Sequence, residues 1–210
     1  MWELVVKGGP IIFLIILCSV IAFAVVIERL WHLRRAKINT TEFMGGIANI
    51  LERNRIMDAI DTCNATPGPI AHILKAGILK HDRSRTEIKE SIEDAGVHEV
   101  PRLEKNLSVL ATIAHITPLL GLLGTVTGMV RSFQVIEQKA TALVPVNPGD
   151  LAGGIWEALI TTVAGLAVAI PTYVAYNFLV SKVDGFVLEM EKSSTDLINI
   201  LGSKREEDEV

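Results

Sequence analysis

Three stretches of this 210-residue chain are long and apolar enough to cross a lipid bilayer. Residues 8–27 and 107–130 contain no Asp, Glu, Lys or Arg, and residues 151–181 contain only Glu157. A membrane-spanning helix needs about 20 predominantly apolar residues. We therefore predict an all-α integral membrane protein with three transmembrane helices.

The charged residues of the chain lie mainly between these stretches, and the formal net charge is −4. Acids and bases nearly balance in the polar regions, which argues against a nucleic-acid surface. Residues 8–27 are expected to be retained rather than cleaved as a signal peptide, because the apolar run continues well past Cys18 and Leu17 is not a small residue. Cys18 lies in an apolar stretch and Cys63 in a charged one, so both are expected to be free thiols.

Lysine and arginine residues predict the orientation in the membrane. Lys7 precedes the first stretch, whereas Arg29, Arg34, Arg35 and Lys37 follow it. Cytoplasmic flanks carry the excess of these residues, so we expect the N-terminus outside and the C-terminus inside, with long cytoplasmic helical extensions. The expected divisions are 1–27 for a short outer N-terminus and the first transmembrane helix, 28–106 for a cytoplasmic helical loop, 107–134 for the second transmembrane helix, 135–150 for an outer loop, 151–181 for the third transmembrane helix, and 182–210 for a cytoplasmic helical tail.

Several residues predict where the helices outside the membrane begin and end. The prolines and glycine of residues 66–69 should separate two amphipathic helices. Another helix should start near Thr86 and be kinked or interrupted at Pro101. Asp150 can cap the third transmembrane helix, and residues 204–210 are expected to form a charged tail without regular structure.

The second and third apolar stretches each carry a face of small residues at helical spacing. In the second stretch and just after it these are Ala111, Ala114, Pro118, Gly121, Thr125, Gly128 and Ser132, and in the third they are Ala158, Thr162, Gly165, Ala169 and Thr172. Small residues let helix backbones approach closely in a membrane, where lipid surrounds the large side chains. The predicted helix-packing residues are Pro118, Gly121, Gly124, Gly128, Gly165 and Pro171.

The polar residues of these stretches are candidates for an ion pathway. Glu157 is costly within a membrane and is expected to face a water-filled path or a partner, although a position near the interface stays open. Thr125, Thr161 and Thr162 could order water, or simply bond back to their own helices. His115 is expected to be a structural histidine in preference to a proton relay.

One acid and one histidine at different depths do not make a proton relay, and threonine hydroxyls hold no net charge. A second protein could supply the missing carboxylate, and homo-oligomerisation around it would turn each threonine into a ring. Enzymatic activity, a metal and a cofactor are not expected, because the histidines outside the apolar stretches are scattered and no nucleophile–base pair or nucleotide-binding loop occurs.

Two sequence segments carry a resemblance to a known family. The segments TPLLGLLGTVTG at 117–128 and GIWEALITTVAGLAVAIP at 154–171 resemble, in this order, the ExbB/TolQ/MotA stator subunits, and the opening residues 1–35 look most like ExbB. The resemblance implies a homopentamer in the bacterial inner membrane, with a periplasmic N-terminus and a cytoplasmic C-terminus. Its central pore would hold a dimeric ExbD- or TolR-like partner whose aspartate is protonated and deprotonated. The motion would pass to a TonB- or TolA-like protein, driven by the proton motive force.

By position, the resemblance assigns pathway roles to Thr125, Glu157 and Thr162, with Thr161 as the neighbouring alternative to Thr162. MotA-type proteins have four spans, so three predicted spans favour ExbB or TolQ. Protons are the ions that the family implies. Two alternatives to an ExbB-like role stay open: a TolQ-like subunit of a Tol-Pal-type envelope system, and a passive membrane scaffold without ion flux.

Overall fold

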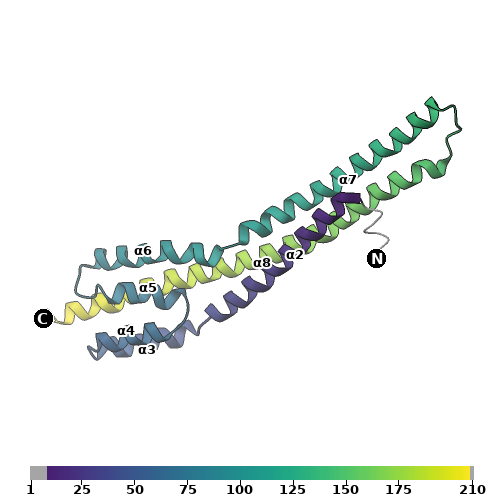
Figure 1. Cartoon of the computed structure of the whole chain (residues 1–210). Helices are drawn as coiled ribbons and strands as arrows, with labels where there is room; N and C mark the ends of the chain where they lie inside the picture. Colours follow the sequence, from purple (N-terminus) through teal and green to yellow (C-terminus); the bar gives the residue numbers. More distant parts are fainter. Residues whose placement is uncertain (1–8, 209–210) are drawn as a thin grey trace. The chain divides into compact units, whose positions relative to one another are not determined.

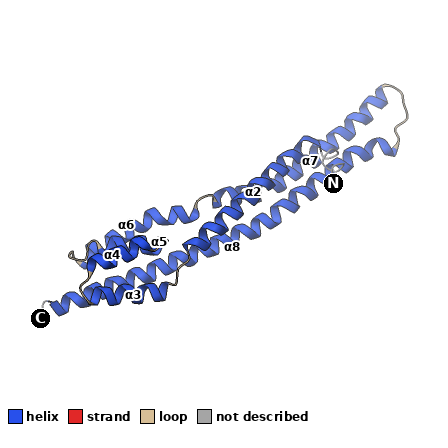
Figure 2. Cartoon of the chain, turned by 60° about the horizontal axis from the view of Figure 1, so that its bottom comes forward, coloured by secondary structure: helices blue, strands red, loops and turns tan. Residues whose placement is uncertain are grey.

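The computed structural model describes residues 9–208, with side chains up to residue 203. The regular secondary structure of this part of the chain is helical throughout (Figure 2). Its helices, labelled in Figure 1, are α2 (Gly9–Ala36), α3 (Thr40–Glu52), α4 (Ile56–Ala65), α5 (Pro69–Ile78), α6 (Arg85–Glu104), α7 (Leu107–Thr141) and α8 (Pro148–Asp208). The predicted outer segment before the first helix lies outside the described residues.

The chain divides into two compact units. The first unit comprises Met1–Glu28 and Asn106–Phe178, and the second comprises Arg29–Lys105 and Leu179–Val210. Three helices are long and apolar enough to cross a membrane, and they contain α2, α7 and α8. The predicted all-helical fold with three candidate membrane spans is therefore confirmed.

In the first unit, α2 buries one narrow stripe and exposes most of its other large side chains. Ile12, Ile15 and Ala22 are almost fully buried, whereas Phe13 and Phe23 are mostly exposed. This distribution suits a helix that is surrounded largely by lipid. A shallow, mainly apolar groove of about 320 Å³ lies between α2 and α8 and is lined by Ser19, Ala22, Phe23, Val26, Ala167, Val168, Pro171, Thr172 and Ala175.

In the second unit, α3 to α6 pack with the C-terminal part of α8 around an aliphatic core. Gly77 of α5 marks a point where three helices meet, because a Cβ there would lie 2.7 Å from the side chain of Ile92 and 3.0 Å from that of Leu197. The helix break predicted at residues 66–69 is confirmed, since α4 ends at Ala65 and α5 begins at Pro69. Proline suits the first turn of a helix because it needs no amide donor there.

The start of α6 is fixed by a capping box one residue before the predicted position. The Ser84 hydroxyl accepts from the Glu87 amide, and the Glu87 carboxylate accepts from the Ser84 amide. The hydrogen bonds from the Ser84 hydroxyl and then from its backbone amide lower the pKa of Glu87 below its ordinary 4.5. Of the kink or interruption predicted at Pro101, the interruption is wrong: α6 runs to Glu104, and the chain turns at Asn106, which has a left-handed φ of 63°. Pro101 is exposed, so solvent can reach the backbone carbonyl that loses its donor.

Two predictions about α8 also need correction. Asp150 does not precede the helix, which begins at Pro148, but lies in its first turn, where its carboxylate accepts from the Asn147 amide at 2.8 Å. A carboxylate in the first turn can satisfy free amides and the positive end of the helix dipole as well as a preceding cap does. The expected unstructured tail is helical through Asp208.

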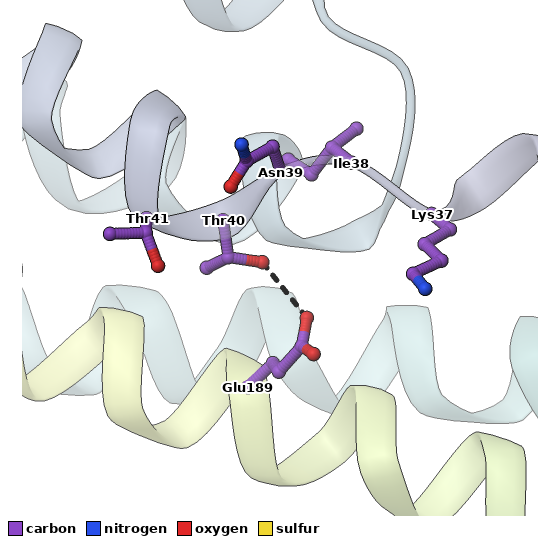
Figure 3. A pocket seen from close by; sticks show the side chains of 6 residues that line it. All are labelled: Lys37, Ile38, Asn39, Thr40, Thr41 and Glu189. Carbon is purple, nitrogen blue, oxygen red and sulfur yellow. Dashed lines mark hydrogen bonds between the residues drawn. The ribbon is translucent and has the colours of Figure 1, made fainter.

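A polar pocket of about 470 Å³ lies where α3 begins beside α8, in the second unit. Figure 3 shows its lining residues Lys37, Ile38, Asn39, Thr40, Thr41 and Glu189. The Thr40 hydroxyl donates to Glu189 Oε2 at 2.8 Å, and Asn39 caps α3 by accepting from the Glu42 amide. The Thr40–Glu189 bond attaches the beginning of α3 to α8.

Candidate functional site

The helices α7 and α8 pack antiparallel through glycine residues at backbone distance. A Cβ on Gly121 would lie 3.0 Å from Thr162 Cα, and a Cβ on Gly165 would lie 2.7 Å from the Thr117 carbonyl oxygen. Neither space admits a side chain without displacing backbone. The two helices are therefore joined by direct backbone contact, as small residues allow in membranes.

The same contact continues along the helix pair. A Cβ on Gly124 would collide with the Thr161 side chain, and a Cβ on Gly128 would lie 2.5 Å from the Gly154 carbonyl oxygen and 3.0 Å from Ala158 Cβ. Of the predicted packing residues, Gly121, Gly124, Gly128 and Gly165 thus lie in this contact. Pro171 instead lines the groove between α8 and α2.

The contact surface of α7 is turned by about one residue from the predicted one. Thr117 and Gly124 are buried in it, whereas Pro118 and Thr125 are only half-buried at its side. The Thr125 hydroxyl donates to the Leu122 carbonyl at 2.6 Å, within its own helix.

Thr161 and Thr162 differ in their surroundings. Thr161 is 1 % exposed, and its hydroxyl lies 2.9 Å from the Ala158 carbonyl oxygen and 3.1 Å from that of Glu157, both in its own helix. Thr162 is half-buried, and its hydroxyl lies 3.2 Å from the carbonyl oxygens of both Ala158 and Gly121. Of these two hydroxyls, only that of Thr162 therefore forms a hydrogen bond from α8 to α7.

Glu157 has a charged partner in the same chain. Arg131 Nη1 lies 2.5 Å from Glu157 Oε1 and 2.6 Å from Glu157 Oε2. The Glu157 side chain is 13 % exposed and that of Arg131 is 50 % exposed. Sequence reasoning missed Arg131, although it is the first charged residue after the second apolar stretch. An antiparallel hairpin of the two helices brings residue 131 opposite the beginning of the third stretch, where Glu157 lies. The positions of these two charged residues in the sequence could therefore have predicted the ion pair.

Residues 65–192 match the MotA/TolQ/ExbB proton channel family. The chain belongs to this family. Among its relatives, an ExbB homolog of Methanothermobacter thermautotrophicus is 28 % identical over 190 residues, which cover 90 % of this chain and 66 % of the relative. The "ExbB-like 1" protein of Synechocystis sp. is 30 % identical over 175 residues, covering 83 % and 68 % respectively.

A solved structure of the family shares the fold. The structure of C. jejuni MotAB superposes with a TM-score of 0.67 at 18 % identity, covering 92 % of this chain and 78 % of that one. Membership of the proton channel family, together with three apolar helices, makes this chain an inner-membrane protein of the ExbB and MotA type. The family match includes α7 and the part of α8 that carries the residues described above.

His115 and a second ion pair make further polar contacts in the first unit. His115 Nδ1 lies 2.6 Å from the Ala111 carbonyl oxygen, and its ring meets that of Tyr173 edge-on at 6.4 Å. Near the connection between the helices, Lys139 Nζ lies 2.5 Å from Asp150 Oδ2. Among the described residues, no group of three or more His, Cys, Asp and Glu side chains is suited to hold a metal ion.

Proposed function

We propose that this chain is a stator subunit of the ExbB type. With a partner of the ExbD kind it converts the proton motive force into mechanical work on a TonB-like protein, and it is not an enzyme. Each proton that crosses releases about 2.3 kcal/mol per 100 mV of membrane potential. A TolQ-like role with TolR- and TolA-like partners uses the same chemistry and is the alternative.

The observation that carries the proposal is how α7 and α8 use their polar groups. The hydroxyls of Thr125, Thr161 and Thr162 bond to backbone carbonyls, and the Glu157 carboxylate is paired with Arg131. A hydroxyl that bonds in this way can exchange its hydrogen bond with water, but it does not hold net charge. We infer that a carboxylate from another protein carries the proton past these residues.

The assembly that fits this inference is a pentamer of the chain around a central pore that holds two partner helices. We place a short periplasmic N-terminus and the first transmembrane helix within residues 1–27, and the other two transmembrane helices at 107–134 and 151–181. Residues 28–106 and 182–210 then lie in the cytoplasm and the loop 135–150 in the periplasm. The excess of Lys and Arg after the first span supports this orientation. A passive scaffold for cytoplasmic proteins would need neither the pentamer nor the pore.

Native mass spectrometry of the detergent-purified chain tests the assembly, alone and co-expressed with a candidate ExbD-like partner. We expect a pentamer that takes up two partner copies, and proton uptake by vesicles that contain the complex but not by vesicles that contain the chain alone. A monomer or dimer that ignores the partner in several mild detergents would contradict the proposal. A scaffold would also tolerate Thr162→Ala and Glu157→Ala, whereas a stator should lose its ion-driven function with either.

A further inference from the structure

Three helices of the first unit meet at the Arg131–Glu157 ion pair. Arg131 extends from α7 and Glu157 from α8, and the beginning of α2 packs against both. A Cβ on Gly9 would collide with Glu157 Oε1 and would lie 3.4 Å from Arg131 Nη1. Gly9 has a φ of 66°, a conformation that glycine adopts readily, so the backbone of α2 can cover the carboxylate.

In this arrangement the rest of the chain shields the Glu157 carboxylate from most contact with water. Both Glu157 oxygens contact one guanidinium nitrogen, and only 13 % of the side chain is exposed. Hydrogen bonds between two ionised groups are stronger than neutral ones and fix the side chains that make them. A proton carrier needs instead to be free to exchange its proton with the pathway.

We propose that Arg131 is a positioning residue that holds Glu157 as a fixed, paired carboxylate, so that Glu157 orients α8 within the ion pathway and does not itself carry the proton. The proposal rests on the stator function above. Glu157 lies one turn from Thr161 on α8, and its backbone carbonyl accepts the Thr161 hydroxyl. The ion pair therefore fixes the rotation of α8 against α7 next to the threonines.

If Glu157 positions α8, a double variant of the ion pair should behave differently than if Glu157 carries the proton. Glu157→Gln alone leaves the Arg131 charge unpaired, and Arg131→Gln alone leaves the Glu157 charge unpaired. The Glu157 end of the pair is nearly buried, so leaving one charge there without its partner is costly, whereas replacing both members by groups of similar size is often tolerated. If the pair positions α8, the double variant Arg131→Gln/Glu157→Gln should recover function, and if Glu157 carries the proton it should not.

The experiment measures potential-driven proton uptake by vesicles that contain the full-length chain with its ExbD-like partner. We expect each single variant to lose at least about tenfold in rate. The double variant and the conservative Arg131→Lys should stay within about threefold of the wild type. A tenfold change in rate corresponds to roughly 1.4 kcal/mol. The matched control is Lys139→Gln/Asp150→Asn, which removes the other ion pair between these helices. We expect its single and double variants to change the rate by less than about threefold.

Thermal unfolding of the same variants in detergent supplies a second readout. The two single variants should each lower the unfolding midpoint, and the double variant should recover part of the loss. A double variant as inactive as Glu157→Gln beside an active wild type would overturn the positioning role and leave the stator function standing. A wild-type complex that takes up no protons would overturn the stator function and, with it, this role. Midpoints that simply add would overturn the coupling itself.

Discussion

Replacing Gly128 with alanine tests the α7–α8 contact where a new methyl group would meet backbone. The added Cβ would lie 2.5 Å from the Gly154 carbonyl oxygen, whereas ordinary contacts begin at 3.4 Å. Gly154 cannot rotate its carbonyl away without breaking α8. The helices must therefore separate by roughly 1 Å at this point, a gap that forfeits a quarter to a half of the dispersion attraction between facing atoms.

The loss of stability expected for Gly128→Ala can be estimated by comparison with Gly153→Ala, which lies on α8 of the same helix pair. A Cβ on Gly153 meets nothing within 4 Å, so that substitution adds only the helix preference of alanine, worth up to about 1 kcal/mol. Gly128→Ala gains the same preference and loses about 1–3 kcal/mol to overpacking. The difference between the two variants, roughly 1–3 kcal/mol, corresponds to about 2–12 °C in unfolding midpoint for a chain of this size.

The assay is thermal unfolding of both variants and the wild type in one detergent, followed by the circular dichroism of the helices. We expect Gly153→Ala to unfold at or slightly above the wild-type temperature and Gly128→Ala clearly below it. A Gly128→Ala variant as stable as Gly153→Ala would mean that the α7–α8 backbones are not in contact, and the account of the small-residue face would be wrong.

Three further predictions concern single side chains. Burial raises the pKa of the Cys63 thiol from its ordinary 9.0 to about 11, so its thiolate fraction at pH 8 falls about a hundredfold. Maleimide should therefore label Cys63 more slowly in the folded chain than in denaturant, and equal rates would contradict its burial. The lowered pKa of Glu87 means that its ionised carboxylate stabilises the folded chain above pH 4.5, and that this stabilisation is lost as the pH falls through the lowered pKa. The difference in unfolding temperature between wild type and Glu87→Gln should therefore be present at pH 7 and disappear in acid, and a difference independent of pH would refute this. Thr162→Val should cost about 1 kcal/mol in unfolding because its hydroxyl bonds across to α7, whereas Thr161→Val should cost less than about 0.5 kcal/mol, and equal costs would argue against that cross-helix bond.

The apolar stretches predicted the membrane helices because their length alone excludes most other folds. The break at residues 66–69 was equally predictable, since proline and glycine act through local backbone geometry. Pro101 was not, because an exposed helix face tolerates the lost hydrogen bond and local sequence does not reveal exposure. The helical start of the charged tail similarly follows from its continuity with α8 rather than from its composition.

The contact surface of α7 shows why the candidate site could be predicted only in part. Gly121 and Gly128 belong to two sets of small residues with the same three- and four-residue steps, one that includes Thr125 and one that includes Gly124. Spacing cannot distinguish these sets, and the choice depends on which one fits α8. The ion pair between Arg131 and Glu157 was missed for the same reason, because it depends on the register between two helices.

The register between α7 and α8 bears on which of Thr161 and Thr162 could contribute to the proposed ion pathway. Thr161 is buried inside the α7–α8 contact, where a third helix cannot reach it. Thr162 is half-buried beside the contact and bonds to the carbonyl of Gly121, which is one helical turn from the half-buried Thr125. A partner helix in the proposed pore could reach the half-buried Thr125 and Thr162 but not the buried Thr161. We therefore propose Thr162 as the pathway residue and a packing role for Thr161.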